Sequence, residues 1–472
     1  MKSCPEFFLF QGTKGISRRS FLRQAATGIG ALTLPSAIFG TSVAQATRHR
    51  SHQHYDIVDV RRTTVRVPYR EIPGRNMARE LPHWMYSEIF EVELKSGEIG
   101  IGETLLYYTW GATDDEDVRR VEKKNAVEMM WDDSLGAGLQ MALFDATART
   151  AEVPVHALLG QKQNQRTPLS WWNIDTSAED MAIECKEAYQ QGYMAYKTKG
   201  RPWIDVWAQV EVSAKEVPES FKIDMDFNDT LLDAQRAIPI LQDLEKHPQV
   251  GIYESPIFQS DIEGNKAIRA ATRVPVAMHY GNPQPLVALR EDVCDGFVIG
   301  GGARRVMEQG AVSAMADKPF WLQLVGTSIT ASFSLHLGGV LSHATWPAVN
   351  CHQLYTHTML TKPIQVSEGF ATVPDEPGLG YALDRDALEA LRITKPVRRP
   401  DPARLIETTW TDGRTMYFGN TGGVNFVLNP SREGKVPFFE RGVKTRLVPN
   451  DGSSKWRDLY ERASKAPFMV GD

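Results

Sequence analysis

From Pro168 onward the chain alternates short apolar runs with longer stretches in which apolar residues recur at helical spacing. The short runs predict β-strands, and the longer stretches predict helices between them. This alternation is typical of a parallel sheet whose strands are joined by right-handed crossovers. The predicted strands are Leu169–Asn173, Met194–Lys199, Lys222–Phe227, Gly251–Glu254, Val274–Met278, Gly296–Ile299 and Phe320–Val325.

A polar residue stands at or just after the end of several of these strands, at nearly constant spacing. Lys199, Asp226, Glu254 and Tyr280 are separated by 27, 28 and 26 residues. In a closed (β/α) barrel the carboxyl ends of all strands surround one pocket, so this period brings the four side chains together. A doubly wound sheet usually carries a glycine fingerprint in its first turn, whereas Gly300–Gly302 falls late in the chain. The pattern therefore predicts an α/β fold of the (β/α) TIM-type barrel class.

The predicted barrel covers residues 167–368, and the segments on either side of it have a different pattern of apolar and polar residues. Residues 47–166 combine strands, a hairpin turn at Ser96-Gly97 and helical patterns, which predicts an N-terminal α+β capping domain. Residues 369–395 are expected to form a segment that returns to this cap. Residues 396–472 begin with a proline-containing linker and are predicted to form a small C-terminal β-rich extension.

The N-terminal segment, residues 1–46, has the features of a twin-arginine signal peptide. Arg18 and Arg19 precede a mild apolar run, and Ala44-Gln45-Ala46 provides an A-x-A cleavage site. A transmembrane anchor is the alternative, but polar residues, glycine and proline interrupt the run, which falls short of the ~20 apolar residues that span a bilayer. We expect export by the twin-arginine route to the periplasm, and no membrane span in the mature chain.

Composition and charge narrow the range of partners. With 42% hydrophobic and 24% charged residues, the chain is typical of a soluble, folded globular protein. Residues 1–46 carry five basic residues and one acidic residue, so the formal net charge changes from −5 for the whole chain to −9 without them. This acidic balance argues against nucleic acid as a partner. The odd set Cys185, Cys294 and Cys351 that remains lacks metal-site spacing and implies no disulfide framework.

The candidate chemistry lies at three neighbouring strand ends. Lys197 and Lys199 are two residues apart and so face the same side of their strand. A lysine near other cations or in a dry pocket can act as a general base, although solvated lysines at a strand end are the plain alternative. Asp226 and Glu254 add two carboxylates, and hard oxygen ligands at this density suit Mg²⁺. A lone aspartate at such a position could instead cap the following helix.

The order K-x-K, D-x-N and E-x-P at successive strand ends resembles the mandelate racemase and muconate lactonizing enzyme branch of the enolase superfamily. The stretches Gly100–Glu103, Gly369–Pro374 and Pro377–Gly380 add to this resemblance, which covers about residues 55–393. It implies a modified, enolase-like barrel with a divalent metal, usually Mg²⁺, that stabilises the enolate formed when a base removes the proton next to a carboxylate. It also implies a small-molecule carboxylate or sugar-derived substrate, and a homo-oligomer is expected.

The resemblance assigns roles to individual residues. Lys199 would be the base, and Lys197 its partner that tunes the charge near the substrate carboxylate. Asp226 and Glu254 would be the first two metal ligands. Asn228 would support this site or contact the substrate.

Two departures from the family pattern shape the expected reaction. The third metal-binding carboxylate is missing, because residues 277–282 read Ala-Met-His-Tyr-Gly-Asn, so metal binding could be weaker, altered or absent. The sixth and seventh strands lead into Gly300–Gly302 and Val325–Ser328 rather than into the usual second base. A racemase needs a proton handler on each face of its substrate, so elimination from one face is favoured. His279 and Tyr280 are the candidate replacements, although His279 could equally be structural.

The sequence therefore predicts a lyase of the dehydratase type that acts on a sugar-acid-like substrate. Trp171 and Trp172 are a candidate floor for that substrate, unless one of them only packs. The alternatives are a racemase, epimerase or cycloisomerase of the same superfamily, or a non-catalytic or metal-free binding protein with a degenerate metal site. Cap loops such as Pro68–Trp84 would decide which substrate is selected.

Overall fold

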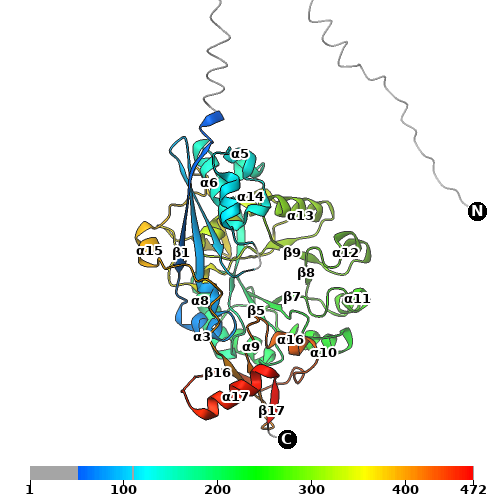
Figure 1. Ribbon diagram of the computed structural model, residues 1–472. Coiled ribbons are helices and arrows are strands. Elements are labelled where there is room, and N and C mark those ends of the chain that lie inside the picture. The colour runs from blue at the N-terminus through cyan, green and yellow to red at the C-terminus, as the bar shows by residue number, and fades with distance from the viewer. Residues whose placement is uncertain (1–51, 109–110, 471–472) are drawn as a thin grey trace, which may run out of the picture. The chain divides into compact units, whose positions relative to one another are not determined.

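The computed structural model describes residues 52–108 and 111–470 (Figure 1). The predicted signal peptide, residues 1–46, lies outside the described residues. None of the helices in the described ranges combines the length and the apolar character needed to cross a membrane.

A ring of parallel strands forms the centre of the described chain. Each strand from β4 to β10 pairs with the next, and β11 pairs with β4. A parallel bridge between Gln323, just after β10, and Val349 in β11 closes the ring. The predicted (β/α) barrel is thereby confirmed, although the short strand β11 was not among the predicted strands. The strands are β4 (Arg166–Trp172), β5 (Ala195–Lys199), β6 (Lys222–Asp226), β7 (Val250–Glu254), β8 (Val276–His279), β9 (Gly296–Ile299), β10 (Phe320–Leu322) and β11 (Ala348–Val349).

Helices connect consecutive barrel strands and cover the outside of the ring. In Figure 1, α13, α12, α11 and α10 follow one another along one side of the barrel. Several helices begin after a residue whose side-chain oxygen accepts a hydrogen bond from the first turn, namely Ser177, Asp205, Asp233, Asp261 and Thr327. These caps fix where each helix starts. The helices are α8 (Ala178–Gln190), α9 (Val206–Ser213), α10 (Ala234–Leu244), α11 (Ile262–Ala271), α12 (Pro285–Glu291), α13 (Ala303–Met315) and α14 (Ser328–Val340).

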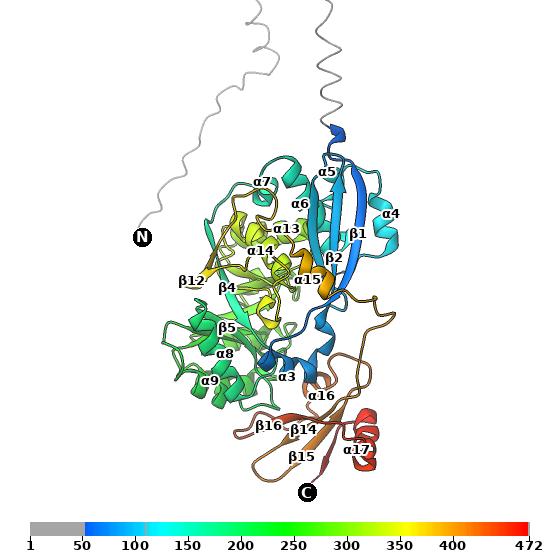
Figure 2. The same cartoon turned by 90° about the vertical axis from the view of Figure 1, so that its left-hand side faces the viewer.

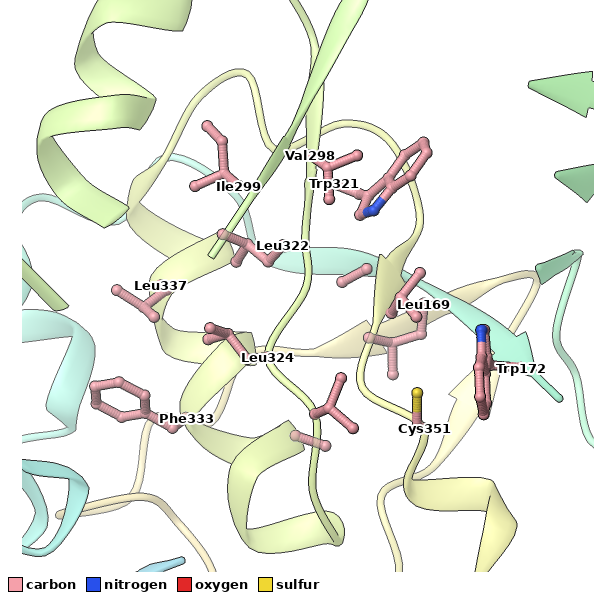
Figure 3. Packing of buried hydrophobic residues seen from close by; sticks show 14 of the residues in the cluster. Leu169, Trp172, Val298, Ile299, Trp321, Leu322, Leu324, Phe333, Leu337 and Cys351 are labelled. Carbon is pink, nitrogen blue, oxygen red and sulfur yellow. The ribbon is translucent and has the colours of Figure 1, made fainter. Parts of the chain in front are cut away.

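Apolar side chains fill the space between the strands and helices. Figure 3 shows Leu322, Leu324 and Phe333 in one group, with Trp172 and Cys351 on another side of it. All five side chains are buried. Since burial of a large apolar side chain stabilises a fold by about 1.5–3 kcal/mol, this core holds the strand ends in fixed positions.

The cap precedes the barrel in sequence and is built on an antiparallel sheet of β1 (Ile57–Arg66), β2 (Tyr86–Leu94) and β3 (Ile99–Leu105). Helix α6 (Ala137–Thr150) packs on β2 and β3. The approach is close, because a Cβ atom added to Gly102 would lie 1.9 Å from the carbonyl oxygen of Gly138. The remaining helical segments of the cap are α3 (Glu71–Glu80), η1 (Pro82–Met85), α4 (Asp115–Val121), α5 (Ala126–Met129), η2 (Asp133–Leu135) and α7 (Val155–Leu159).

Glu103, which follows the close-packed glycines of β3, links the cap to the barrel. Its buried carboxylate accepts hydrogen bonds from the hydroxyls of Ser87 at 2.9 Å, Thr327 at 2.9 Å and Thr330 at 3.0 Å. Thr327 and Thr330 belong to the start of α14, on the barrel side. The Gly-x-Gly-Glu motif therefore serves the packing of the cap on the barrel, because the Glu103 carboxylate at its end accepts hydrogen bonds from barrel residues.

The chain returns to the cap after the barrel. Strands β12 (Val366–Ser367) and β13 (Phe370–Thr372) form a hairpin, and β13 pairs antiparallel with β4. Helix α15 (Arg385–Ala390) follows, and the backbone carbonyl of Leu391 accepts a 3.0 Å hydrogen bond from the amide of Arg66 in β1.

The C-terminal extension is a four-stranded antiparallel sheet in the order β16-β14-β15-β17. Its apolar core includes Ile406 and Phe418, together with Trp203 and Ile204 from the loop after β5 of the barrel. Figure 2 shows the extension, coloured orange to red, beyond α3. Its elements are β14 (Leu405–Thr409), β15 (Thr415–Gly419), α16 (Leu428–Arg432), β16 (Lys444–Val448), α17 (Ser454–Lys465) and β17 (Phe468–Val470).

Candidate active site

The carboxyl ends of β5 to β8 bring charged residues from distant parts of the sequence to one mouth of the barrel. In the strand register, Lys199 stands beside Asp226, and Asp226 stands beside Glu254. Lys197 lies one inward-facing position below Lys199 on β5. His279 ends β8. The near-constant sequence spacing thus corresponds to adjacency in space.

These side chains form a continuous line of ion pairs. The ammonium group of Lys199 bonds to Oδ2 of Asp226, and that of Lys197 bonds to Oε2 of Glu254 and lies 3.9 Å from Oδ2 of Asp226. The other oxygen of Glu254, Oε1, is 2.9 Å from Nε2 of His279. Because cations and anions alternate along this line, their charges largely compensate each other although most of them are buried.

The two lysines differ in how easily they lose a proton. Burial lowers the pKa of Lys199; Asp226 raises it in part, and the neighbouring cations Lys197 and Arg201 lower it further, so that its pKa stands below the usual lysine value. Burial also lowers the pKa of Lys197, but Glu254 and Asp226 outweigh burial and leave it above the usual value. Lys199 is therefore the better candidate for a base, and Lys197 for a permanent cation.

A cavity of about 230 Å³ opens beside the two lysines. Its wall is built from the cap, the barrel and the C-terminal extension together. A cavity of this size holds a small organic molecule rather than a polymer segment. The side chains that line it include Glu80, His83, Trp84, Tyr107 and Tyr108 from the cap, Trp172, Asp175, Lys197, Lys199, Arg201, Asn228, Gln323, Val325, Val349 and Cys351 from the barrel, and Val424, Asn425 and Leu428 from the extension.

Arg201 adds a third cation to the cavity wall. Its guanidinium donates to Oδ1 of Asp175 at 3.2 Å, to the carbonyl of Phe227 at 3.2 Å and to Oδ1 of Asn228 at 2.7 Å. Oδ1 of Asn228 also accepts a 3.1 Å hydrogen bond from Lys199. Arg201 was not predicted from the sequence, although continued alternation after Lys197 and Lys199 points to it.

The two predicted tryptophans have different surroundings. Trp172 lines the cavity and stacks on Trp84 of the cap, with 5.6 Å between ring centroids. Trp171 instead donates from Nε1 to Glu184 of α8 at 2.8 Å and packs under Arg70. Trp171 thus packs away from the cavity, and Trp172 alone of the pair lies where a substrate could rest.

His279 and Tyr280, predicted as replacements for missing family residues, do not line the cavity. The imidazole of His279 is paired with Glu254, and its side chain is 45% exposed. Tyr280 packs edge-on against Phe297 of β9, with 5.3 Å between ring centroids. The catalytic roles assigned to these two residues from the sequence stay predictions.

The donor set at the barrel mouth differs from that of an Mg²⁺ site, for which carboxylate and water oxygens in octahedral geometry are preferred. The third strand-end position holds the imidazole of His279, and both carboxylates already pair with ammonium groups. Within residues 52–108 and 111–470, no group of three or more His, Cys, Asp or Glu side chains is placed to hold a metal ion. The residues therefore do not fit the Mg²⁺ ion that the resemblance implies, and the ligand roles of Asp226 and Glu254 stay predictions.

Comparison with known proteins places this barrel among characterised relatives. Residues 180–387 match the family described as Enolase C-terminal domain-like. The chain is 21% identical to an N-succinyl-L-Arg/Lys racemase of Bacillus cereus, over 56% of this chain and 73% of that protein. It is 23% identical to an arabinonate dehydratase of Saccharolobus solfataricus, over 62% of this chain and 87% of that protein. The structure of a muconate lactonizing enzyme from Pseudomonas fluorescens in complex with muconolactone shares the fold, with a TM-score of 0.59, 18% identity, and 72% and 100% of the two chains covered.

Proposed function

Because the chain belongs to the enolase superfamily, we propose that it is a lyase that removes the proton next to the carboxylate of a sugar-acid-like substrate and expels the β-hydroxyl group as water. The relatives include an arabinonate dehydratase and a D-gluconate dehydratase, which supports the substrate class. The chain is 23% identical to each of these relatives, which supports the class of substrate but does not identify one sugar acid.

The observation that carries the proposal is the position of Lys199 in the cavity wall, between Lys197 and Arg201. Lys199 is the proposed base, because burial and the neighbouring cations Lys197 and Arg201 lower its pKa below the usual lysine value, which favours the free amine. Proton transfer by a positioned side chain of this kind contributes about 10²- to 10⁴-fold to a rate.

The remaining cations of the cavity have a proposed electrostatic role. Removal of the α-proton places negative charge on the carboxylate oxygens of the substrate. Lys197 stays an ammonium ion and Arg201 a guanidinium, so both can hold the carboxylate before the reaction and stabilise the added charge during it. Their bonds to Glu254, Asp175 and Asn228 keep them in place, so little reorganisation is needed when charge develops.

The opposite side of the cavity supports elimination rather than racemisation. Strands β10 and β11 and the residues after them contribute Gln323, Val325, Val349 and Cys351 to the wall. Burial raises the pKa of the Cys351 thiol, so the thiol keeps its proton and cannot accept another, and the other three side chains carry no basic group. A racemase needs a second base on that face, whereas water loss needs only one base and one acid.

The test is incubation of the purified protein with a panel of aldonic and aldaric acids in D₂O. Formation of a 2-oxo acid, detected as its semicarbazone and by NMR, is the expected result for at least one member. Lys199→Ala is expected to abolish it, whereas the exposed Lys215→Ala serves as the matched control with full activity. Deuterium at the α-carbon with inversion and without water loss would replace the lyase by a racemase or epimerase. Unchanged turnover in Lys199→Ala would refute the proposed base.

A further inference from the structure

Water loss from a β-hydroxy acid requires a proton donor as well as a base, because hydroxide is a poor leaving group. The barrel side of the cavity offers few candidates. His279 and Tyr280 do not line it, and Lys199 must be unprotonated when it acts as the base. Asp175, which does line it, accepts hydrogen bonds on both oxygens, from Arg201 at 3.2 Å and from Trp203 at 3.0 Å.

The cap side of the cavity carries Glu80, the last residue of α3. Its side chain is 12% exposed, and Oε1 accepts a 3.0 Å hydrogen bond from Nε of Arg79. Glu80 lines the same cavity as Lys197 and Lys199 but comes from the other domain. Glu80 therefore places a carboxyl group on the cap side of the cavity that the proposed base also lines.

The backbone that carries Glu80 is held by the C-terminal extension. Arg404, just before β14, donates from Nη1 to the carbonyl oxygens of Arg79 and of Glu80, both at 2.9 Å. Its Nη2 is fixed in turn by Asp401 at 2.6 Å. A donor that must meet a departing oxygen needs such a fixed position, because misplacement by about 1 Å can cost 10²-fold in rate.

We infer that Glu80 is a further catalytic residue, the acid that protonates the departing hydroxyl group; this inference rests on the proposed lyase function. Lys199 takes the α-proton, and the C–H electron pair moves onto the substrate carboxylate as an enediolate before it returns to form the Cα=Cβ bond. The Cβ–O bond breaks with its electron pair on oxygen, which takes the proton of Glu80 and leaves as water. The enol product then tautomerises to the 2-oxo acid, Glu80 regains a proton from solvent, and Lys199 returns its proton to solvent.

The protonation behaviour of Glu80 agrees with this role. Burial raises the pKa of Glu80, the nearby Asp175 raises it further, and Arg79 and Arg201 lower it in part, which leaves it at about 7. A carboxylic acid with this pKa is substantially protonated at neutral pH and can still give its proton away.

His83 is the competing donor on the cap. It is buried and lines the cavity, and its Nε2 has no hydrogen-bond partner among the residues that the structure describes. Burial lowers its pKa to about 4, and Arg399 and Arg404 lower it as well. The imidazole is therefore neutral at neutral pH, and suits a hydrogen bond to a substrate hydroxyl rather than proton donation.

The experiment compares two substrates that differ only in the leaving group. A β-hydroxy acid that the wild type dehydrates is paired with its β-fluoro analogue, since fluoride departs without needing a proton. For Glu80→Gln we expect a loss of 10²-fold or more in kcat on the hydroxy acid. We expect less than about 10-fold loss on the fluoro acid, and continued exchange of the α-proton with D₂O. Glu71→Gln, at the exposed first position of the same helix, is the matched control.

Different outcomes separate the inference from the function on which it rests. A wild type that neither exchanges the α-proton nor forms a 2-oxo acid overturns the lyase itself. If the wild type reacts, and Glu80→Gln lowers kcat equally on both substrates or lowers it on neither, only the role of Glu80 is overturned. The same holds if His83→Gln, and not Glu80→Gln, shows the leaving-group selectivity. If Glu80→Gln does not fold, Glu80→Asp, which withdraws the carboxyl group by one methylene, is expected to show the same selectivity.

Discussion

Arg432 in the C-terminal extension donates a 2.8 Å hydrogen bond from Nε to the backbone carbonyl of Asn228 in the barrel. It also pairs with the carboxylate of Asp229 at 3.0 Å. Asn228 and Asp229 both adopt positive φ angles, of 43° and 68°, a region that is uncommon for residues other than glycine and that Asn and Asp enter more readily than most. The extension therefore supports the turn whose side chain at Asn228 holds both Lys199 and Arg201.

Arg432→Ala should release this turn. We expect kcat to fall about 10- to 100-fold, because Asn228 no longer fixes Lys199, while KM changes less. Arg441→Ala, which removes a solvent-exposed pair with Glu211, is the control and should leave both constants unchanged. Steady-state kinetics with a turned-over sugar acid provide the measurement, and an Arg432→Ala enzyme as fast as wild type would contradict the positioning role.

The donor set at the barrel mouth predicts the response to Mg²⁺. An excess of Mg²⁺, or its removal by EDTA, should leave the melting temperature of the wild type unchanged. His279→Glu supplies a third carboxylate and should gain a Mg²⁺-dependent rise, worth about 2.7 kcal/mol at a concentration 100 times the dissociation constant. His279→Gln controls for loss of the imidazole. A wild type that melts higher with Mg²⁺ and lower with EDTA would show that the family's metal is retained.

The raised pKa of Glu80 predicts two pH effects. If the protonated form is the acid, kcat/KM on a β-hydroxy acid should fall as pH rises through about 7, while the rate on the β-fluoro analogue should not show this decline. Burial is the main cause of this raised pKa; Asp175 raises it further, and Arg79 and Arg201 lower it in part.

The same shift affects folding stability. A carboxyl whose folded pKa is about 7 against an ordinary value of 4.5 binds its proton more tightly in the folded state, so its contribution is complete below pH 4.5 and is lost as pH rises through about 7. The unfolding free energy of the wild type should therefore fall over this window relative to Glu80→Gln. Urea titrations at several pH values measure it, and parallel curves for the two proteins would contradict the shift.

The expectation of export rests on Arg18 and Arg19, the apolar run after them and the cleavage site Ala44-Gln45-Ala46, all within residues 1–46, which lie outside the described residues. In a host with the twin-arginine pathway, the full chain should accumulate in the periplasm as a shorter, processed form. Replacement of both arginines by lysine should keep the full-length protein in the cytoplasm. Cell fractionation and the N-terminal sequence of the periplasmic form provide the test, and unchanged export of the Lys-Lys variant would exclude this route.

The strand ends could be predicted because a barrel repeats one unit. Lys199, Asp226 and Glu254 are spaced by about one strand-helix unit. In the parallel register they therefore lie side by side on neighbouring strands. Alternation could have refined the prediction further. Adjacent residues of a strand face opposite sides, so Trp171 and Trp172 could not both line the cavity.

Other parts of the site depend on packing between distant segments. Glu80 and His83 reach the cavity because the cap folds over the barrel, and Val424 and Leu428 because the extension packs beside it. No periodicity in the sequence encodes these approaches. β11 was missed because a strand of two residues, Ala348–Val349, is too short to show a pattern.

The shared apolar cluster around Trp203 has a consequence for how this protein can be divided. Trp203 and Ile204 belong to the loop after β5 of the barrel, yet they are buried against Ile406 and Phe418 of the C-terminal sheet. If the chain were cut at the linker before that sheet, the indole of Trp203 would be exposed to water. The backbone carbonyl of Asn228 would also lose the hydrogen bond that Arg432 donates. The terminal sheet therefore contributes to the interior of the barrel, and its removal is expected to lower the melting temperature of the barrel.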